Sequence, residues 1–421
     1  MSDDQPAPGE AKGSGGMFRA LQYRNYRLFF CGQGLSLIGT WIQQVAMGWL
    51  VYRLTNSAWL LGVIGFSGQI PAFFLTPIAG VLADRLPRRH VLIVTQTLAM
   101  VQAFALGVLV LSGAIRVWHI VAMSAFMGAV NAFDMPTRQS FVIEMVENKE
   151  NLGNAIALNS SLFNSARLIG PTIAGIVIHL TGEGVCFVLN GVSYLAVIAA
   201  LIWMRTSRPA TRPTQAPVLR GLKEGLSYAA HSPVISTALV FVAAMSFIAM
   251  PYAVLMPVMA KSVLGGGPAT LGLLLASGGL GAVAGALFLA ARGGAEGLRL
   301  TAAWATCLFG GGLIGLSLSR IMPLSMAMMV LMGFGMTVQM ASNNTAVQTA
   351  VEDSKRGRIM SLFVMGQFGL APFGNLLAGA LAQRVGAPPT LLLAGACSIA
   401  CAGLLALRMS VLRGRRAVAS E

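Results

Sequence analysis

The stretch "GVLADRLPRR", residues 80–89, places one aspartate and three arginines between two long apolar segments. The segments, approximately 58–83 and 90–112, are each long enough to cross the ~30 Å hydrocarbon core of a bilayer as a helix. Proline cannot continue a helix interior, and charged side chains are costly inside a membrane. The stretch therefore predicts a tight loop at a membrane surface, joining two antiparallel membrane helices.

The composition of the whole chain extends this interpretation. Of its 421 residues, 56% are hydrophobic and only 10% are charged, and its mean hydropathy is +0.72. Soluble domains are about one-quarter charged. The sequence predicts an all-α polytopic membrane protein with twelve spans, at approximately 26–51, 58–83, 90–112, 117–137, 153–180, 185–204, 234–259, 268–291, 299–318, 322–346, 359–382 and 388–409.

The net charge of +15 follows the predicted topology. Of 29 lysines and arginines, 23 lie in or beside the two tails and the loops on the same side as the tails, five lie in the opposite loops, and Arg167 lies within a span. Basic residues accumulate on the cytoplasmic side of membrane proteins. We therefore expect both termini in the cytoplasm of a bacterium, a multi-pass protein of the inner membrane, and no binding of nucleic acid.

The chain divides into two halves of six spans. We expect a disordered cytoplasmic tail over 1–17, a first bundle over 18–205, a cytoplasmic linker with an amphipathic helix over 206–233, a second bundle over 234–409 and a tail over 410–421. An offset of 204 residues places Gly153, Gly170 and Gly175 on Gly357, Gly374 and Gly379. Two similar bundles around a central cavity are typical of transporters.

Residues 80–89 resemble the signature G-x-L-A-D-R-x-G-R-R/K of the major facilitator superfamily. The matching residues are Gly80, Leu82, Ala83, Asp84, Arg85, Arg88 and Arg89, whereas Pro87 replaces a glycine. The resemblance implies the twelve-helix major facilitator fold and alternating access. It also implies that Asp84 contacts the N-terminus of span eleven, as a latch of the outward-open state. Alternatively, these charges only set the topology.

A second stretch, "ARLIGPTIAG" at 166–175, resembles the fifth-span antiporter motif of the same superfamily. Gly170, Pro171 and Gly175 occupy its positions, and Ala166 and Ala174 replace two glycines. The resemblance implies export. Ordinary packing of small residues between membrane helices is the alternative. With "NAFDMPTRQSFVIEMV" at 131–146, the region 18–205 is similar to the branch of enterobactin exporters and multidrug efflux proteins.

Ionisable groups inside membrane spans are costly, which makes each a functional hypothesis. Arg167 lies near the middle of span five. It can bind an anionic substrate, pair with Asp134, or be tied by neighbouring groups such as Asn164. Asp134 can carry a proton, or it can lock span four through Arg138, four residues later. The sequence leaves these alternatives open.

Neutral amides form the remaining candidate set. Each can line a cavity or join two helices, and the candidates are Gln43, Asn131, Asn164, Gln339, Asn343 and Gln367. The chain has no Walker motif, no metal-ligand spacing and no set of catalytic groups, so we expect neither ATP hydrolysis, a metal nor an enzyme.

Taken together, these features predict a secondary active exporter of small amphiphilic molecules, siderophore-like or drug-like, driven by proton antiport without a cofactor. An arginine without a carboxylate in the core favours anionic or neutral cargo. The partners expected are the small-molecule substrate, the lipid bilayer and protons, and the sequence does not identify an outer-membrane partner. The alternatives are an importer and, further removed, a non-transporting sensor or scaffold.

Overall fold

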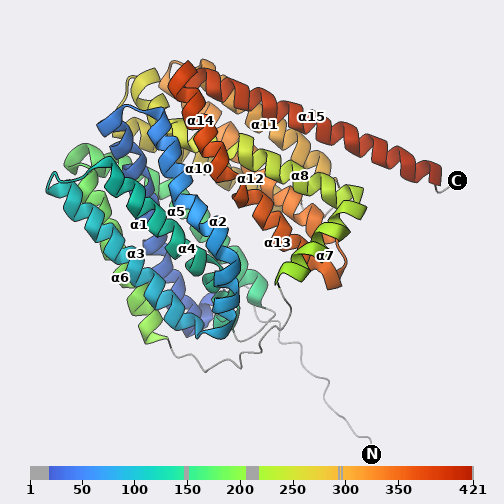
Figure 1. Ribbon diagram of the computed structural model, residues 1–421, viewed down its shortest axis with the longest axis horizontal. Helices are drawn as coiled ribbons and strands as arrows, with labels where there is room; N and C mark the ends of the chain where they lie inside the picture. Colours follow the sequence, from blue (N-terminus) through green and yellow to red (C-terminus); the bar gives the residue numbers. More distant parts are fainter. Residues whose placement is uncertain (1–18, 147–150, 205–217, 293, 295–296, 420–421) are drawn as a thin grey trace, which may run out of the picture.

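The structure, a computed structural model, describes residues 19–146, 151–204, 218–292, 294 and 297–419 (Figure 1). The described residues form helices and connecting turns, without a strand. The long helices of the first half are α1 (Arg24–Thr55), α2 (Ala58–Arg85), α3 (Arg88–Leu111), α4 (Val117–Met145), α5 (Leu152–Thr181) and α6 (Glu183–Trp203). Those of the second half are α7 (Val218–His231), α8 (Pro233–Ile248), α10 (Pro268–Arg292), α11 (Leu298–Leu318), α12 (Met322–Ala350), α13 (Asp353–Gly369), α14 (Ala371–Val385) and α15 (Ala387–Ala419).

The all-α membrane fold expected from the sequence is confirmed. Within the described chain, ten helical segments are long and apolar enough to cross a membrane. The long helices α1 and α4, with 32 and 29 residues, exceed the bilayer thickness at ~1.5 Å per residue but carry more polar side chains. The ten segments and these two helices together are consistent with twelve spans.

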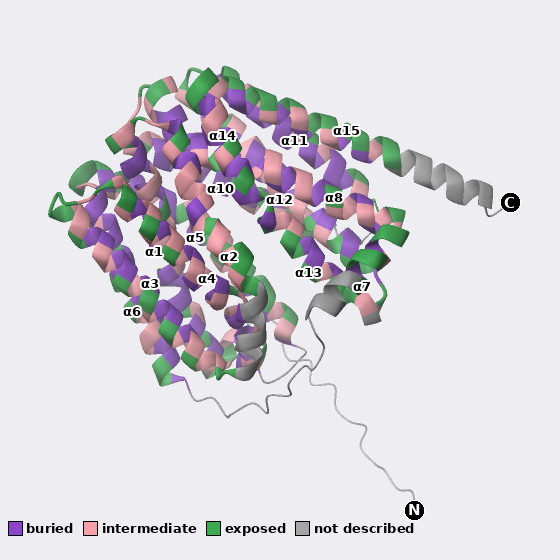
Figure 2. Ribbon diagram, in the orientation of Figure 1, coloured by how far each residue is buried: buried purple, intermediate pink, exposed green. Residues whose placement is uncertain are grey.

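Large apolar side chains cover the outside of the helices. Val108, Leu287 and Leu404 are each about two-thirds exposed, and many others share this position. Figure 2 shows buried residues on the faces that neighbouring helices turn toward one another, and exposed residues on the outer faces. Soluble proteins rarely expose so much apolar surface. The exposed belt therefore faces lipid.

The two ends of the helices form two sides of the molecule, which we name by their connections. The turn side carries the short connections 56–57, 112–116, 319–321 and 386. The linker side carries 86–87, 351–352 and α7. The side on which basic residues accumulate in the sequence is the linker side.

The two halves pack against each other on the turn side, through α5 against α10 and α2 against α14. Gly62 and Gly379 approach so closely that a Cβ at either would lie 3.0 Å or less from the other's Cα. Two hydrogen bonds between the halves also hold the turn side closed. Tyr52 and Ser262 share one of 2.6 Å, and Lys261 Nζ donates to Asn56 Oδ1 at 2.8 Å. Toward the linker side the two groups of helices diverge (Figure 1).

Two helices of the second half are interrupted where the sequence predicts continuous spans. After α8 the chain continues through η3 (Met250–Leu255), α9 (Met256–Val258) and η4 (Met259–Val263), and α13 gives way to α14 at Leu370. The cause is local, because Pro251 and Pro372 stand in the first turn of the segment that follows each interruption. A proline there has no N–H to donate to the preceding turn.

Helix α7 lies within the stretch 206–233 where a linker helix is expected, and it packs against protein. Tyr228 and Ala229 join an apolar cluster with Ile359 and Phe363 of α13. Glu224 pairs with Arg358 at 2.6 Å. Residues 1–17 and 205–217 lie outside the described residues, and residues 410–419 of the expected C-terminal tail continue α15 as a helix.

Candidate transport site

Arg167 lies on α5 at the junction between the two halves. A Cβ at Gly279 of α10 would be 3.0 Å from the Arg167 carbonyl oxygen, which shows how closely α10 passes. The side chain is half-buried, and its guanidinium has no hydrogen bond or ion pair with any described residue. A charged group in this position needs water or a ligand, because contact with lipid costs at least ~2.5 kcal/mol. The expected alternative partner, Asn164, donates instead to Ser160 of its own helix at 2.9 Å.

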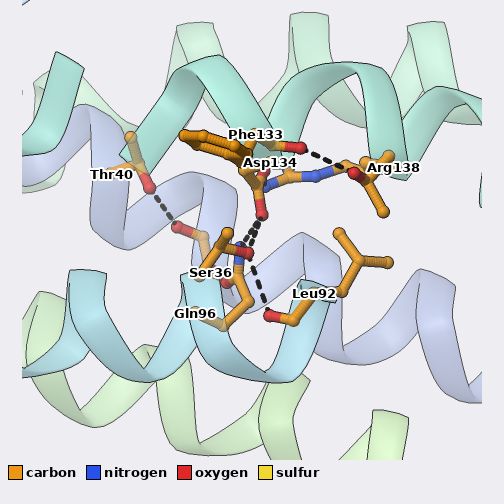
Figure 3. A network of polar contacts seen from close by, with 9 residues as sticks. Ser36, Thr40, Leu92, Gln96, Phe133, Asp134 and Arg138 are labelled. Atoms are coloured by element: carbon orange, nitrogen blue, oxygen red, sulfur yellow. Dashed lines mark hydrogen bonds and ion pairs between the residues drawn. The ribbon is translucent and has the colours of Figure 1, made fainter. Parts of the chain in front are cut away.

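Asp134 is the centre of a buried polar network between α3 and α4 (Figure 3). Its side chain is 3% exposed. Its Oδ1 accepts from Thr95 Oγ1 at 2.9 Å and from Gln96 Nε2 at 2.7 Å. Its Oδ2 forms an ion pair with Arg138, one turn further along α4. Asp134 therefore pairs with Arg138 and not with Arg167, as the spacing of four residues allows.

Gln43 belongs to a second buried network, which joins three helices of the first half. It donates to Gln102 Oε1 of α3 at 3.0 Å and accepts from Asn190 Nδ2 of α6 at 2.8 Å. Both the nitrogen and the oxygen of the Gln43 amide are therefore hydrogen-bonded within the protein. This geometry supports a role in joining helices rather than in binding cargo.

Replacing Gln43 with alanine tests that role. The change leaves the buried amides of Gln102 and Asn190 short of a partner, which costs about 1–3 kcal/mol. We expect a lower melting temperature of the purified protein and an unchanged KM for cargo. Gln44→Ala, at an exposed position next to it, is the control and keeps the wild-type stability. A raised KM at unchanged melting temperature would contradict this role and place Gln43 in the cargo site.

The second half contains a pocket between α8, α11, α12 and α13. It brings together two of the expected amides, Gln339 and Gln367, with four methionines and two phenylalanines. Ser246, which the sequence analysis missed, also lines it, and its buried hydroxyl has no hydrogen-bond partner among the described residues. The lining residues are Val242, Met245, Ser246, Ala249, Met250, Phe309, Met336, Gln339, Met340, Phe363 and Gln367.

This pocket has a neutral, polarisable lining and little free space. Its cavity volume is about 40 Å³, whereas drug-sized ligands occupy pockets of roughly 300–1,000 Å³. Methionine side chains are unbranched and adapt to ligands of different shape. In this conformation the pocket can therefore hold only a small part of a cargo molecule. The expected candidate Asn343 lies in a different cavity, and Asn131 is half-buried on α4.

The stretch 80–89 contains the end of α2, the connecting residues 86–87 and the start of α3, so the expected loop is shorter than the stretch. The surroundings of Gly80 and the side chains of Asp84 and Arg85 lie outside the described residues, so the expected latch stays a prediction. Arg88 forms an ion pair with Glu144 of α4. Arg89 donates to the carbonyl oxygens of residues 201 and 202 at the end of α6, both at 2.6 Å. These contacts join α3 to α4 and α6, a role beyond setting topology.

The stretch 166–175 lies at the interface of the halves. Gly170 is buried against Trp41 of α1, whose Cβ would be 2.5 Å from an added Cβ. A Cβ on Gly272 of α10 would lie 2.4 Å from the Pro171 carbonyl oxygen and 3.0 Å from the Gly175 Cα. The motif therefore permits a backbone-to-backbone contact between α5 and α10. The helix α5 stays continuous through Pro171.

Several residues of the two networks escaped the sequence analysis, namely Thr95, Gln96, Gln102 and Asn190. Each interrupts an apolar span, which is the signal that marks them. Their partners come from other helices, up to 147 residues away in the chain. The spacing within one span does not contain this information.

Comparison with known proteins places these features in context. Residues 16–420 match the family described as transmembrane secretion effector. The staphyloferrin A transporter of Staphylococcus aureus is 25% identical over 377 residues, covering 89% of this chain and 93% of that protein. The multidrug efflux pump Tap of Mycolicibacterium fortuitum is 26% identical over 362 residues, covering 84% and 88%. A solved bacterial homologue of the human lysosomal transporter Spinster, inward-facing and occupied, shares the fold with a TM-score of 0.72 at 13% identity, over 92% and 97% of the chains.

Proposed function

Because the chain belongs to the transmembrane secretion effector family of the major facilitator superfamily, we propose that it exports small amphiphilic molecules across the bacterial inner membrane by proton antiport. Members of this superfamily are transporters of small molecules and not enzymes. The names of the two relatives, a siderophore transporter and a multidrug efflux pump, support cargo of this class.

The proposed cargo is an anionic or neutral amphiphile, and Arg167 carries this proposal. Its guanidinium, which has no partner within the described part of the chain, stands where the halves meet and can hold a carboxylate or catecholate through two parallel hydrogen bonds. The methionine-lined pocket of the second half offers an uncharged surface for an apolar part of the same molecule. A cation would meet the Arg167 charge without a compensating carboxylate nearby.

The proposed direction, export, rests on the resemblance of residues 166–175 to the antiporter motif. With the linker side in the cytoplasm, as the basic residues predict, contact between 166–175 and α10 closes the outer side in this conformation. Alternating access then requires this contact to open. Asp134 is the proposed proton site, since it is a buried carboxylate well inside a membrane helix.

Removing the Arg167 charge tests the proposed function. We expect an anionic siderophore to collapse a preset proton gradient in proteoliposomes holding the wild-type protein in the inside-out orientation. We expect the Arg167→Ala variant to respond at least about tenfold more slowly, since a charge-assisted pair contributes roughly 1.5–3 kcal/mol. Arg167→Lys keeps the charge but not the two-pronged contact and is expected to fall between them.

The control is Arg384→Ala, which removes an arginine from an exposed position of α14. It is expected to behave as wild type. Neutral macrolides and cationic dyes are compared in the same vesicles. Collapse of the gradient by cations that persists in Arg167→Ala would overturn the anionic cargo and reduce Arg167 to a structural role. Uptake of cargo with protons, instead of exchange against them, would establish the importer.

A further inference from the structure

One face of α5 changes from exposed to buried at Arg167. Residues that recur at intervals of three and four lie on the same side of a helix. On the linker side of Arg167 this face is open, since Ile156 is 53% exposed and Phe163 is 47% exposed. On the turn side the same face is closed, with Ala174 and Ile178 at 0% and 5%. Arg167 therefore stands at the closed end of an exposed stretch of α5.

This face of α5 points toward the other half of the molecule. Its closed part, Ala174 and Ile178, belongs to a core cluster that also contains Met245 of the second half. Helix α1 meets the second half on the turn side as well, because a Cβ on Gly48 would lie 3.3 Å from Cγ of Pro257 in α9. The exposed part of the face is therefore turned toward the junction of the halves, which diverge toward the linker side (Figure 1).

Two aromatic rings lie beside Arg167 at this closed end. Phe163 precedes Arg167 by four residues, one turn of the same helix face. Trp41 of α1 packs edge to face against Phe163, with ring centroids 5.9 Å apart. Trp41 also extends past Arg167, because a Cβ on Gly170 would lie 2.5 Å from the Trp41 Cβ. The indole of α1 and the guanidinium of α5 are therefore at the same level of the molecule.

The guanidinium and the two rings do not engage each other. Within the described part of the chain, Arg167 has no ring contact, hydrogen bond or ion pair. Phe163 keeps almost half of its surface exposed in spite of its contact with Trp41. Aromatic rings pair with other rings offset or edge-on, at centroid distances of ~4.5–7 Å. Both a cation and an aromatic surface are therefore available to a ligand at this point.

We propose that the cargo carries its anion directly on an aromatic ring, as in an aryl carboxylate or a catecholate. Phe163 and Trp41 hold the ring, and Arg167 holds the anion. This inference rests on the proposed function and names the cargo class of that same site. Four residues of an α-helix rise by ~6 Å, so the Phe163 ring and the Arg167 guanidinium can meet adjacent groups of one small ligand. An aliphatic carboxylate would use Arg167 and gain nothing from the rings beyond apolar contact.

The test compares two acids of similar bulk, naphthalene carboxylate and its saturated counterpart decalin carboxylate, by calorimetric titration of the full-length protein in detergent. We expect the wild-type protein to bind the aromatic acid about fivefold more tightly, which is ~1 kcal/mol. Phe163→Leu keeps the apolar contact but removes the ring, and it is expected to lower this ratio to about twofold or less. Phe163→Tyr keeps the ring and is expected to keep the wild-type ratio.

The matched control is Phe288→Leu, which removes a ring of α10 that is 37% exposed and packs against Trp304 of α11. It is expected to keep the wild-type ratio. The melting temperature of Phe163→Leu is expected to equal that of the wild type, because the replaced side chain is almost half exposed. An unchanged melting temperature shows that a lost ratio does not come from misfolding.

The outcomes separate the aromatic cargo from the anion site. Equal affinity of the wild-type protein for the two acids, or a ratio that persists in Phe163→Leu, would overturn the aromatic cargo. If both acids then lose affinity in Arg167→Ala, the anionic cargo of the proposed function still stands. Binding of both acids that Arg167→Ala does not weaken would contradict the anion site itself. Failure of either acid to bind the wild-type protein would overturn both proposals.

Discussion

Replacing Asp134 by asparagine is expected to abolish proton-driven transport while cargo exchange without a proton gradient continues. The carboxylate is the proposed proton site, and asparagine keeps its shape but does not titrate. Uptake driven by a pH gradient in proteoliposomes should fall to the level of empty vesicles, a loss of about a hundredfold or more. Counterflow of labelled against unlabelled cargo, which needs no net proton movement, should stay within about twofold of wild type.

The rival role of Asp134 is a lock that joins α3 and α4, and the same residues distinguish it. Asp134→Asn leaves Arg138 without its partner, and breaking a buried pair costs about 3–5 kcal/mol, less here because the Arg138 side chain is 25% exposed. If Asp134 is instead a structural lock, Asp134→Asn would lower the melting temperature and would also lose counterflow. The double change Asp134→Asn with Arg138→Gln would then restore both. If Asp134 carries the proton, the double variant stays uncoupled.

Enlarging Gly175 to leucine is expected to reduce transport by about tenfold to a hundredfold. An added Cβ would lie 3.0 Å from the Ala269 Cα and 3.3 Å from the Gly272 Cα, both backbone atoms of α10. These atoms cannot rotate away as a side-chain end can, so the halves must separate. Overpacking of this kind costs typically 1–3 kcal/mol. This cost destabilises the conformation in which the turn side is closed. The population therefore shifts toward the conformation that is open on the turn side.

Two measurements follow this shift. The reporter is Ala58→Cys, because Ala58 is 5% exposed on the turn side and its carbonyl oxygen lies against Gly379 of the other half. In a background whose native cysteines are replaced, it should react faster with an impermeant maleimide in Gly175→Leu than without that change. Gly153→Leu is the matched control, because it lies on the same helix with nothing within 4 Å of an added Cβ. Wild-type transport and reactivity in Gly175→Leu would show that α5 and α10 need not touch during the cycle.

Much of the fold was predictable because membranes impose simple rules. The length and hydropathy of the apolar segments located the spans. The spans at α1 and α4 are more polar, but they were recognised because the alternation of basic residues between the loops requires an even number of spans, here twelve. The glycines paired by an offset of 204 residues also agree with the structure, where Gly175 meets Gly272 and Gly379 meets Gly62. The breaks after Ile248 and at Leu370 were missed, because prolines also occur inside the continuous helices α4 and α5.

The sequence alone determined the class of protein, its spans and the short set of polar residues inside them, because lipid excludes charge and unpaired backbone from its core. The tertiary structure decided what each of those residues does. It engaged Asp134 with Arg138, Thr95 and Gln96, and among the described residues it gave the Arg167 side chain no partner. Such pairings depend on which faces of different helices meet. The hydropathy of a single span does not specify those faces, because they are set by the packing of helices that are distant in the sequence.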